Sequence, residues 1–398
     1  MTPRRKALSH WIKARVHQTP ALDAWLDARL MTGGASVPGR ALYLRLFPER
    51  ALRAPMLQRE LEEPTRRLTI LSLVPPEDTG GGSRPARLAE EFLRAGWAID
   101  WRWTLPIFPW PSQGRPETPH ATVHHISEQV PLLPSDLVLV EAPHAEFLPL
   151  LETAPGKPIV LYEQIDLWQD DLALGWFDAG VERALMTRAD FLSATSRLLA
   201  RRVEEQRRRP CAYIPNAADT ALFSIDENRA RPTDLRGGQP TLVYVGALWG
   251  EWVDLDLIAT IADQLPEAEI HLIGRAGDRT MPKRSNIHLL GEKPRETIPA
   301  YLQYADAALV PFRESAVAAA VSPLKAFEAL VMGCPLVSTP IPEMVAIPEV
   351  VAAKPAEFAA AIQRVRRTSA SAEALSRLRA DASWTQRVEA ILDLTGLR

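Results

Sequence analysis

Short apolar runs alternate with stretches of helical spacing along most of the chain. In the C-terminal half, four runs rich in branched or apolar side chains cover residues 242–248, 269–274, 306–312 and 335–339. They are short and nearly continuous, as in parallel strands that are buried on both faces. Between the first two runs, residues 254–265 place apolar side chains at helical spacing. The pattern predicts strand-helix-strand units and a parallel sheet.

The same alternation begins earlier in the chain, near residue 67. Predicted strands cover residues 68–74, 96–103, 135–141, 158–163 and, together with a helix cap, 189–196. Helical patterns cover residues 84–95, 197–209 and 371–398, and another begins near residue 181. We therefore expect two α/β domains, with the glycine-containing stretch 231–240 as the linker between them.

These elements divide the chain into four segments. Residues 1–67 are the least regular and form an N-terminal helical extension in this prediction. Residues 68–232 and 233–380 are two Rossmann-like domains, and residues 381–398 are a C-terminal helix.

One predicted helix carries the pattern of an anion site. Ser322 is a good N-cap and Pro323 suits the first turn, so that the N–H groups of this turn can bind a phosphate. Glu328 follows on the same helix, which Gly333 ends and Pro335 prevents from continuing. A helix start followed by one carboxylate fits a nucleoside diphosphate, because phosphates need donors and ribose hydroxyls need an acceptor. A surface helix with a Ser cap and a solvated Glu is the alternative.

Ligands of open parallel sheets bind outside the carboxyl ends of the strands. Gly246, Gly274, Phe312 and Ser322 all lie at or just after such ends, so we expect them to line one crevice.

A glycine-rich loop lies between the first predicted strand and helix of the N-terminal half. Gly81 and Gly82 permit close backbone approach, and the helix that starts after Ser83 offers N–H donors. The loop lacks the spaced G-x-G-x-x-G pattern, so it does not predict dinucleotide binding. A plain flexible turn is the alternative.

Five motifs of the C-terminal half resemble a known family. In order they are Val-Gly-Ala-Leu-x-x-Glu-Trp-x-Asp at 245–254, Leu-Ile-Gly at 272–274, Asn-Ile-x-Leu-Leu-Gly at 286–291, Ala-Asp-Ala-Ala-Leu-Val-Pro-Phe at 305–312 and Ser-Pro-Leu-Lys-x-Phe-Glu-x-Leu-x-x-Gly-x-Pro-x-Val at 322–337. This set resembles the C-terminal domain of GT-B glycosyltransferases. It is most similar to the bacterial branch that builds cell-surface polysaccharides, including teichuronic-acid-type enzymes.

The resemblance implies a fold and an activity. The fold is GT-B, with two Rossmann-like domains facing across a cleft, the first binding the acceptor and the second the donor. Residues 381–398, with Ser383-Trp-x-x-Arg387, resemble the helix that crosses back to the first domain. The implied reaction is transfer of a hexosyl or deoxyhexosyl group from a nucleotide diphosphate-sugar to a carbohydrate or lipid-linked acceptor in bacterial surface polysaccharide synthesis.

The resemblance also implies retention of anomeric configuration, no cofactor and no metal. The sequence agrees with the last point, since no Asp-x-Asp motif stands at a strand end to hold a cation. The charge of the leaving group would instead be met by the helix start at Ser322, by Lys325 or Arg275, and by the glycine loop.

The same resemblance implies candidate site residues. His144 corresponds to a histidine that faces the donor sugar, and Glu163 and Asp166 lie in a segment similar to the family's Tyr-x-x-x-Asp. A loop histidine with satisfied hydrogen bonds and a helix N-cap at Asp166 are the alternatives. The candidate donor-binding residues are Gly81, Gly82, Ser83, Gly246, Gly274, Arg275, Phe312, Ser322, Pro323, Leu324, Lys325 and Glu328. Asn216 and Asp219 match the family's Pro-Asn-x-x-Asp turn, in which they are structural residues.

The chain departs from the family pattern at two places. The family has two glutamates eight residues apart, whereas Ala320 stands eight residues before Glu328. Glu251 and Trp252 stand where a basic residue often follows the first glycine turn. A nucleotide-sugar epimerase of the same fold, or a noncatalytic GT-B partner in a polysaccharide assembly complex, therefore remain as alternative functions.

The composition of the chain excludes some classes of partner and site. The net charge of −3 and the isoelectric point near 6.3 give no reason to expect nucleic acid. Cys211 and Cys334 are far apart, so a disulfide framework or a zinc site is not expected. No apolar stretch is long enough for a transmembrane helix, and we expect a cytoplasmic protein.

Two aromatic segments suggest surfaces for other partners. The N-terminus combines Arg4, Arg5 and Lys6 with Trp11 and Ile12, which fits either a solvated terminus or a helix on the inner face of an anionic membrane. The loop at 105–119, with Phe108 and Trp110, could contact the acceptor or pack against its own domain.

Overall fold

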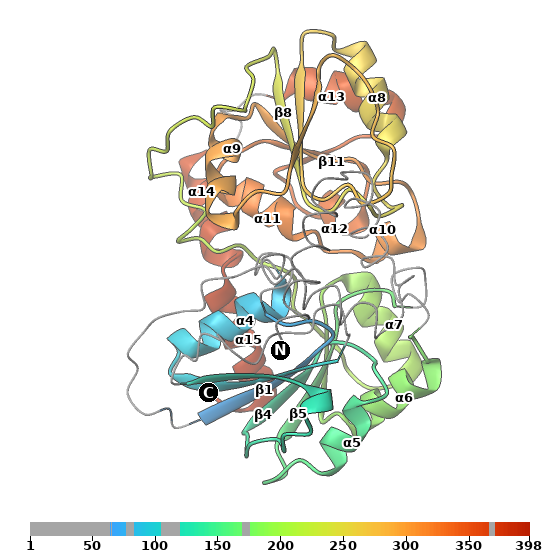
Figure 1. Ribbon diagram of the computed structural model, residues 1–398, viewed down its shortest axis with the longest axis vertical. Helices are drawn as coiled ribbons and strands as arrows, with labels where there is room; N and C mark the ends of the chain where they lie inside the picture. Colours follow the sequence, from blue (N-terminus) through green and yellow to red (C-terminus); the bar gives the residue numbers. More distant parts are fainter. Residues whose placement is uncertain (1–63, 65, 77–82, 105–119, 169–175, 366–370) are drawn as a thin grey trace, which may run out of the picture. The chain divides into compact units, whose positions relative to one another are not determined.

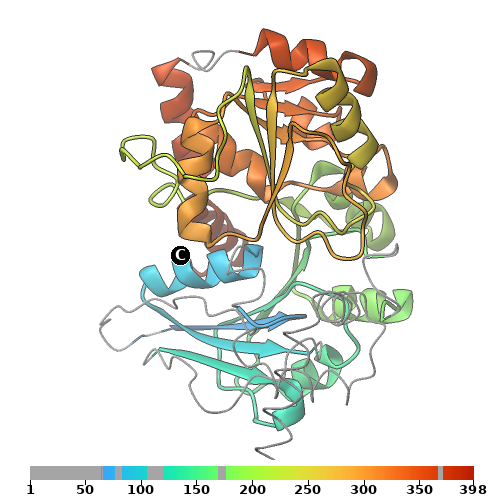
Figure 2. The same ribbon diagram turned by 45° about the horizontal axis from the view of Figure 1, so that its top comes forward.

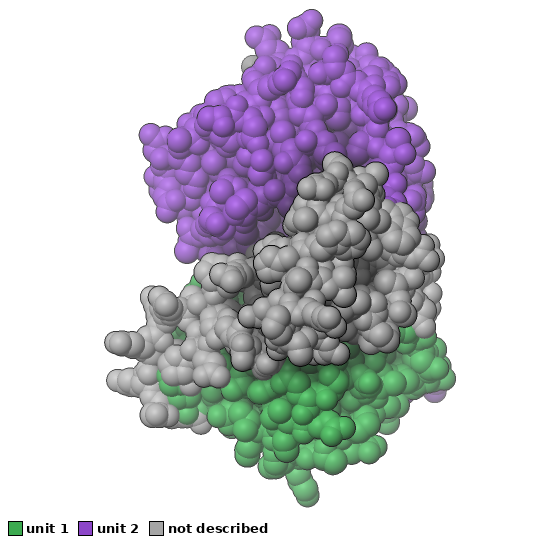
Figure 3. All heavy atoms as spheres, in the orientation of Figure 1, with its two compact units in different colours: residues 1–162, 171–190 green, residues 163–170, 191–398 purple. Residues whose placement is uncertain are grey.

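The structure is a computed structural model that describes residues 64, 66–76, 83–104, 120–168, 176–365 and 371–398 (Figure 1). The chain divides into two compact units, one of residues 1–162 and 171–190 and the other of residues 163–170 and 191–398 (Figure 3). No helix of the described residues is both long and apolar enough to cross a membrane.

The first sheet has seven strands in the order β3-β2-β1-β4-β5-β6-β7. The strands are β1 (Arg66–Ser72), β2 (Trp97–Trp103), β3 (Ala121–His125), β4 (Leu137–Val140), β5 (Ile159–Gln164), β6 (Phe191–Ala194) and β7 (Ala212–Tyr213). Their helices are α4 (Arg84–Arg94), α5 (Phe147–Glu152), α6 (Ala179–Arg188) and α7 (Arg197–Arg207). Strand β1, in the interior of the sheet, pairs in parallel with β2 and β4, and Leu68, Ile70 and Leu71 are fully buried, as the apolar run predicts.

The second sheet has six strands in the order β10-β9-β8-β11-β12-β13 and lies in the second unit. The strands are β8 (Thr241–Val245), β9 (Glu269–Ile273), β10 (Ile287–Gly291), β11 (Ala307–Val310), β12 (Leu336–Ser338) and β13 (Val350–Ala352). All pairings in this sheet are parallel. The reversal of strand order between β8 and β11 is the point at which ligands of such sheets bind.

Helices cover both faces of the second sheet (Figures 1 and 2). On one face, α8 (Leu255–Gln264) packs against α13 (Phe358–Arg364). On the other face, α9 (Ile298–Tyr304) and α11 (Leu324–Val331) line one small cavity against β8 and β11. The remaining helices are α10 (Ala316–Ala320), α12 (Pro342–Val345), α14 (Ala372–Asp381) and α15 (Trp384–Thr395). This arrangement buries a continuous apolar core that includes Leu242, Val243, Ile270 and Val337.

Most predicted elements are confirmed within a few residues, and the differences are local. Strands β3, β7, β10 and β13 and helices α5, α10, α12 and α13 were not predicted from the sequence. Helix α11 begins at Leu324 with Pro323 as its N-cap residue and with no capping side chain, so the prediction that Ser322 caps this helix is wrong. The end of the helix agrees with prediction, since Gly333 adopts a positive φ of 64° and its N–H donates to Leu330 O.

The predicted domain boundaries at 67, 232 and 380, and the crossing of residues 381–398 to the first domain, stay predictions. The extension 1–67 lies almost entirely outside the described residues, as do Gly81, Gly82 and the aromatic loop at 105–119.

Candidate functional site

Two glycine turns meet at the carboxyl ends of β8 and β9. Gly246 and Gly274 have φ values of 136° and 143°, a region that side-chain-bearing residues rarely adopt. The N–H of Gly246 donates to Ile273 O at 2.8 Å, and the N–H of Gly274 donates to Gly291 O at 2.9 Å. A Cβ on Gly274 would lie 1.9 Å from Gly246 O. The two turns are therefore in direct backbone contact, which only glycine at position 274 permits.

Lys325 of α11 reaches the first of these turns. A Cβ on Gly246 would lie 2.5 Å from Lys325 Nζ. The same Nζ donates to Tyr244 Oη at 3.0 Å and lies 4.4 Å from the centre of the Tyr244 ring and 5.1 Å from that of Phe312. Burial lowers the pKa of Lys325 to about 7, although the nearby Glu328 raises it. Near neutral pH the site therefore holds an amine that gains or loses its charge easily.

Ser322 has a different role from the predicted one. It is buried, its Oγ accepts from the N–H of Asn216 at 3.4 Å, and its carbonyl accepts from Asn216 Nδ2 at 2.6 Å. Arg387 of α15 in turn donates to Asn216 O and Pro215 O. The Asn216 turn thus holds the segment ahead of α11, in agreement with the structural role expected for Asn216.

Glu328 lies one helical turn after Lys325 on α11 and forms an ion pair with Arg295. Arg295 belongs to the short helix η5 (Arg295–Thr297), and its guanidinium lies 3.4 Å from Glu328 Oε1 and 3.5 Å from Asp219 Oδ2. It also covers the ring of Phe223, at 5.2 Å from its centre. Sequence reasoning missed Arg295, because nothing in its local pattern distinguishes it from a solvated arginine.

Two other arginines near the glycine turns already have partners. Arg275, a predicted donor-binding residue, pairs with Glu292 at 2.9 Å. Arg279 donates to the carbonyls of Leu248, Gly250 and Val253 and thereby braces the loop that follows β8. Glu251 and Trp252 belong to this loop. Arg279 therefore holds the loop in place, but the loop has no basic side chain of its own at these two positions.

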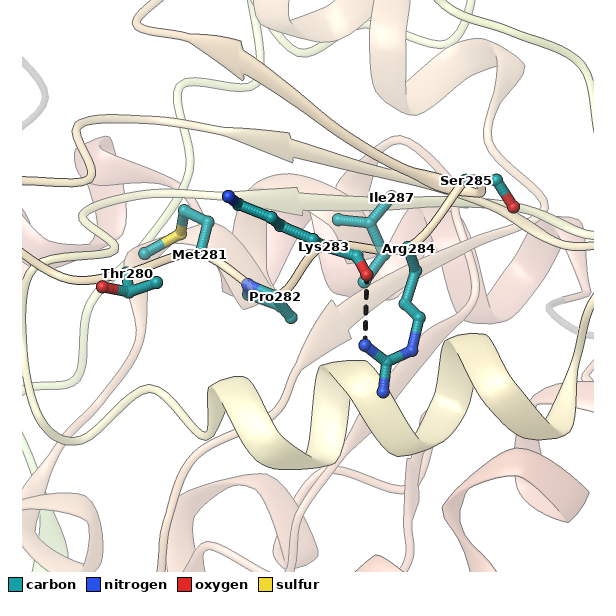
Figure 4. A pocket seen from close by; sticks show the side chains of 7 residues that line it. All are labelled: Thr280, Met281, Pro282, Lys283, Arg284, Ser285 and Ile287. Carbon is teal, nitrogen blue, oxygen red and sulfur yellow. Dashed lines mark hydrogen bonds between the residues drawn. The ribbon is translucent and has the colours of Figure 1, made fainter.

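The second unit has one small cavity that Lys325 and Glu328 line, and one larger hollow that no candidate site residue lines. The cavity that Lys325 and Glu328 line with α9, β8 and β11 has a volume of only about 10 Å³, at the limit for one water molecule. A hollow of about 600 Å³ lies along the loop before β10 (Figure 4) and is lined by Thr280, Met281, Pro282, Lys283, Arg284, Ser285 and Ile287. None of these seven residues belongs to the predicted site. The larger hollow is therefore not our candidate, in spite of its size.

His144 lies in the first unit, just after β4. Its Nδ1 is 3.3 Å from Thr104 Oγ1 and 3.9 Å from Glu146 Oε2, and Thr104 Oγ1 donates to Glu146 at 2.5 Å. The rings of Phe147 and Trp176 lie 5.8 Å from the His144 ring. Burial lowers the pKa of His144, and Glu146 partly opposes this effect. His144 is thus largely neutral at pH 7 and able to accept a proton or a hydrogen bond.

Glu163 and Asp166 lie in the second unit. Glu163 is buried and its Oε1 accepts from Ser193 Oγ at 3.2 Å. Burial raises the pKa of Asp166 to about 7, and no described helix begins at this residue. Asp166 can therefore carry a proton near neutral pH. In the first unit, Ser83 precedes α4, and its hydroxyl is buried without a hydrogen-bond partner among the described residues.

Comparison with known proteins agrees with this geometry. Residues 239–368 match the family model described as Glycosyl transferases group 1, and this segment contains the whole second sheet and α11. A protein of Bacillus subtilis (strain 168), named as the teichuronic acid biosynthesis glycosyltransferase TuaH, is 25% identical over 213 residues. That match covers 49% of this chain and 53% of the relative, so the chain spans about half the length of the curated protein.

Solved structures extend the likeness to both sheets. HepE of Anabaena in complex with UDP-glucose has a TM-score of 0.55 at 14% identity, covering 82% of this chain and 99% of that one. The alpha,alpha-trehalose 6-phosphate synthase of Burkholderia multivorans has a TM-score of 0.58 at 12% identity, covering 83% and 98%. The fold is therefore GT-B, and residues 239–368 are similar to the family of group 1 glycosyl transferases.

Proposed function

We propose that this protein is a glycosyltransferase that moves a hexosyl or deoxyhexosyl group from a nucleotide diphosphate-sugar to a carbohydrate or lipid-linked acceptor. We place the reaction in bacterial surface polysaccharide synthesis, with retention of configuration and without a metal. The observation that carries the proposal is the convergence of Gly246, Gly274, Lys325 and Glu328 at the switch point of the second sheet.

Each of these residues fits one part of the donor. The glycine turns carry no side chains that would keep a phosphate from the backbone, and the positive end of the α11 dipole favours an anion beside Lys325 in its first turn. Lys325 supplies the positive charge that Trp252 and Glu251 do not. Glu328 accepts from the ribose hydroxyls. An ionised carboxylate has about four acceptor positions, so the contact to Arg295 and the ribose bonds can coexist.

The remaining donor residues support this assignment in different ways. The ring of Phe312 lies 5.1 Å from Lys325 Nζ, and Pro323 and Leu324 form the helix start. Ser322 orients the segment ahead of the helix through Asn216. Arg275, which already pairs with Glu292 at a partly exposed position, can exchange this partner for a phosphate. Gly81, Gly82 and Ser83 stay donor-binding candidates on the sequence alone.

In this proposal the catalytic residues are His144, Glu163 and Asp166. A neutral imidazole at His144 can accept a hydrogen bond from a sugar hydroxyl, and a carboxyl group at Asp166 with a pKa near 7 can exchange a proton with the acceptor. Buried Glu163 supports the segment that carries Asp166, together with Ser193. HepE is described in complex with UDP-glucose, and TuaH is named for teichuronic acid biosynthesis; both names support a nucleotide-sugar donor and a polysaccharide acceptor.

The test is incubation of the protein with UDP-, GDP-, dTDP- and ADP-linked hexoses, followed by separation of the products. Slow release of free sugar and nucleoside diphosphate from one donor, lost in Glu328→Gln, is the expected result. Conversion of the donor into an isomeric nucleotide sugar would show an epimerase. No binding of any nucleotide sugar would leave the noncatalytic partner as the function.

A further inference from the structure

Lys325 Nζ lies in surroundings that offer an ammonium group little compensation. Its one hydrogen-bond acceptor among the described residues is the neutral Tyr244 Oη, and its nearest aromatic neighbours are the rings of Tyr244 and Phe312. The Tyr244 hydroxyl gives its own proton to Ala247 O, and burial raises the Tyr244 pKa, so this residue does not become an anion. An ammonium group in a partly buried position, with no anion as a hydrogen-bond partner among the described residues, is costly to maintain.

The charged groups around Lys325 do not remove the cost of keeping its amine protonated. Glu328 lies one turn away on the same helix, but its carboxylate is shared with Arg295 of η5. Arg279, whose charge acts on Tyr244, adds a positive charge on the side of the β8 loop. The carboxylate of Glu328 raises the pKa of Lys325, but not enough to offset burial, and Arg279 adds a positive charge near Tyr244.

The end of the Lys325 side chain packs directly against the backbone of the turn at Gly246, which only glycine permits at this position. A Cβ there would lie 2.5 Å from Nζ and 2.8 Å from Cε of Lys325. Since Gly246 has no side chain, a group resting on the glycine turn can reach the amine directly. A diphosphate placed on this turn would supply the anion that the free site lacks.

We propose that Lys325 takes up one proton when a nucleotide diphosphate-sugar binds, and that it loses this proton when the nucleotide leaves. The inference rests on the proposed donor site and adds the charge state of that site. In the free protein a neutral amine is stabilised by its surroundings, whereas the diphosphate stabilises the ammonium. Burial alone already lowers the pKa of Lys325 to about 7, so the transition falls within the physiological range.

Linkage fixes the expected pH dependence. Below pH 7 the free protein already carries the charge, and donor affinity should be constant. Above pH 7 each binding event requires a proton, so affinity should fall by about tenfold per pH unit until the pKa of the bound state is reached. The donor itself does not contribute, because a diphosphate esterified at both ends carries no group that titrates near neutrality.

The experiment is isothermal titration calorimetry of the full chain with UDP-glucose, GDP-mannose, dTDP-glucose and ADP-glucose, in buffers of low and high ionisation enthalpy. At pH 8 the slope of observed enthalpy against buffer enthalpy should correspond to uptake of about 0.9 proton, and at pH 6 to nearly none. Lys325→Arg, which is always charged, should bind donor without proton uptake. Lys283→Met removes an exposed lysine away from the site and should leave the uptake unchanged.

A second measurement does not depend on variants. Carbon-13 labelling of lysine side chains should show one resonance that titrates near pH 7 in the free protein and no longer does so with saturating donor. Donor binding with no dependence on buffer enthalpy at pH 8 would overturn the inference while leaving the proposed function intact. Absence of binding by every nucleotide sugar would overturn both.

Discussion

The guanidinium of Arg295 lies 3.4 Å from the carboxylate of Glu328, although the two residues come from different elements on one face of the second sheet. The same guanidinium approaches Asp219, so one arginine joins α11 to the turn that precedes the sheet. The carboxylate assigned to the ribose is therefore oriented before any ligand arrives.

Glu328→Gln should weaken nucleotide-sugar binding by about ten- to a hundredfold. The amide keeps the size of the side chain but removes the charge, and charge-assisted hydrogen bonds contribute about 1.5–3 kcal/mol. Glu314→Gln is the matched control, because Glu314 is exposed and should tolerate the change. Dissociation constants from calorimetry give the comparison. If Glu314→Gln is instead the damaging variant, the ribose site has been assigned to the wrong carboxylate.

Arg295→Gln should weaken donor binding less than Glu328→Gln does, and should act through Glu328. Without its guanidinium partner, Glu328 loses its fixed orientation, and Asp219 loses an ion pair. A double-mutant cycle measures this coupling, since Arg295→Gln should have little further effect on affinity in the Glu328→Gln background. Fully additive losses would show that Arg295 does not act through Glu328.

Gly274→Ala should destabilise the protein and abolish donor binding. The new Cβ would lie 1.9 Å from Gly246 O, at a φ of 143°, and overpacking of this kind costs about 1–3 kcal/mol. The control is Gly237→Ala, where the Cβ would meet only the flexible end of Arg231 at 3.3 Å. Urea unfolding should show a lower midpoint for Gly274→Ala alone. Equal stability of the two variants would mean that the turns are not in contact.

Stability should fall as the pH drops below about 6.5 because of His271. This side chain is fully buried in β9, its Nε2 accepts from the N–H of Arg236 at 2.9 Å, and burial lowers its pKa. The unfolded chain then binds a proton that the folded chain does not, so the contribution is complete above the unfolded pKa and is lost toward acid. Its slope is at most about 1.4 kcal/mol per pH unit.

Urea unfolding of the parent and of His271→Gln at pH 7.5, 6.5 and 5.5 measures this contribution. The variant should be less stable at pH 7.5 but should show a flatter pH dependence. Parallel pH profiles for the two proteins would assign the acid sensitivity to other groups.

Hydrophobic patterning predicted the strands that position the site, because β8, β9, β11 and β12 are short and mostly apolar, in a sheet that helices cover on both faces. Among the elements that it missed are β3, whose sequence Ala-Thr-Val-His-His has no such run, and the short alanine-rich α10. The cap at Ser322 was predicted from the local sequence. In the structure its hydroxyl instead accepts a hydrogen bond from the N–H of Asn216, which is far away in the chain.

The contacts between charged residues of the site could not be predicted from the sequence pattern. The contacts of Lys325 with Tyr244 and of Arg295 with Glu328 join residues that only the sheet topology brings together. Periodicity predicts which face of an element is buried, yet it does not say which charged groups of other elements meet there. Gly246 and Gly274 could be identified only as strand ends, and their backbone contact follows from parallel pairing of β8 with β9.

A crystal structure of the protein with a bound nucleoside diphosphate tests the central claim most directly. UDP, GDP, dTDP and ADP would first be screened by thermal shift, since a ligand at 100 times its dissociation constant stabilises the folded state by about 2.7 kcal/mol. We predict that the diphosphate rests on the turn at Gly246 within contact of Lys325, with the ribose hydroxyls on Glu328. A diphosphate bound instead in the hollow lined by Thr280 to Ile287, with the turn at Gly246 unoccupied, would contradict the account.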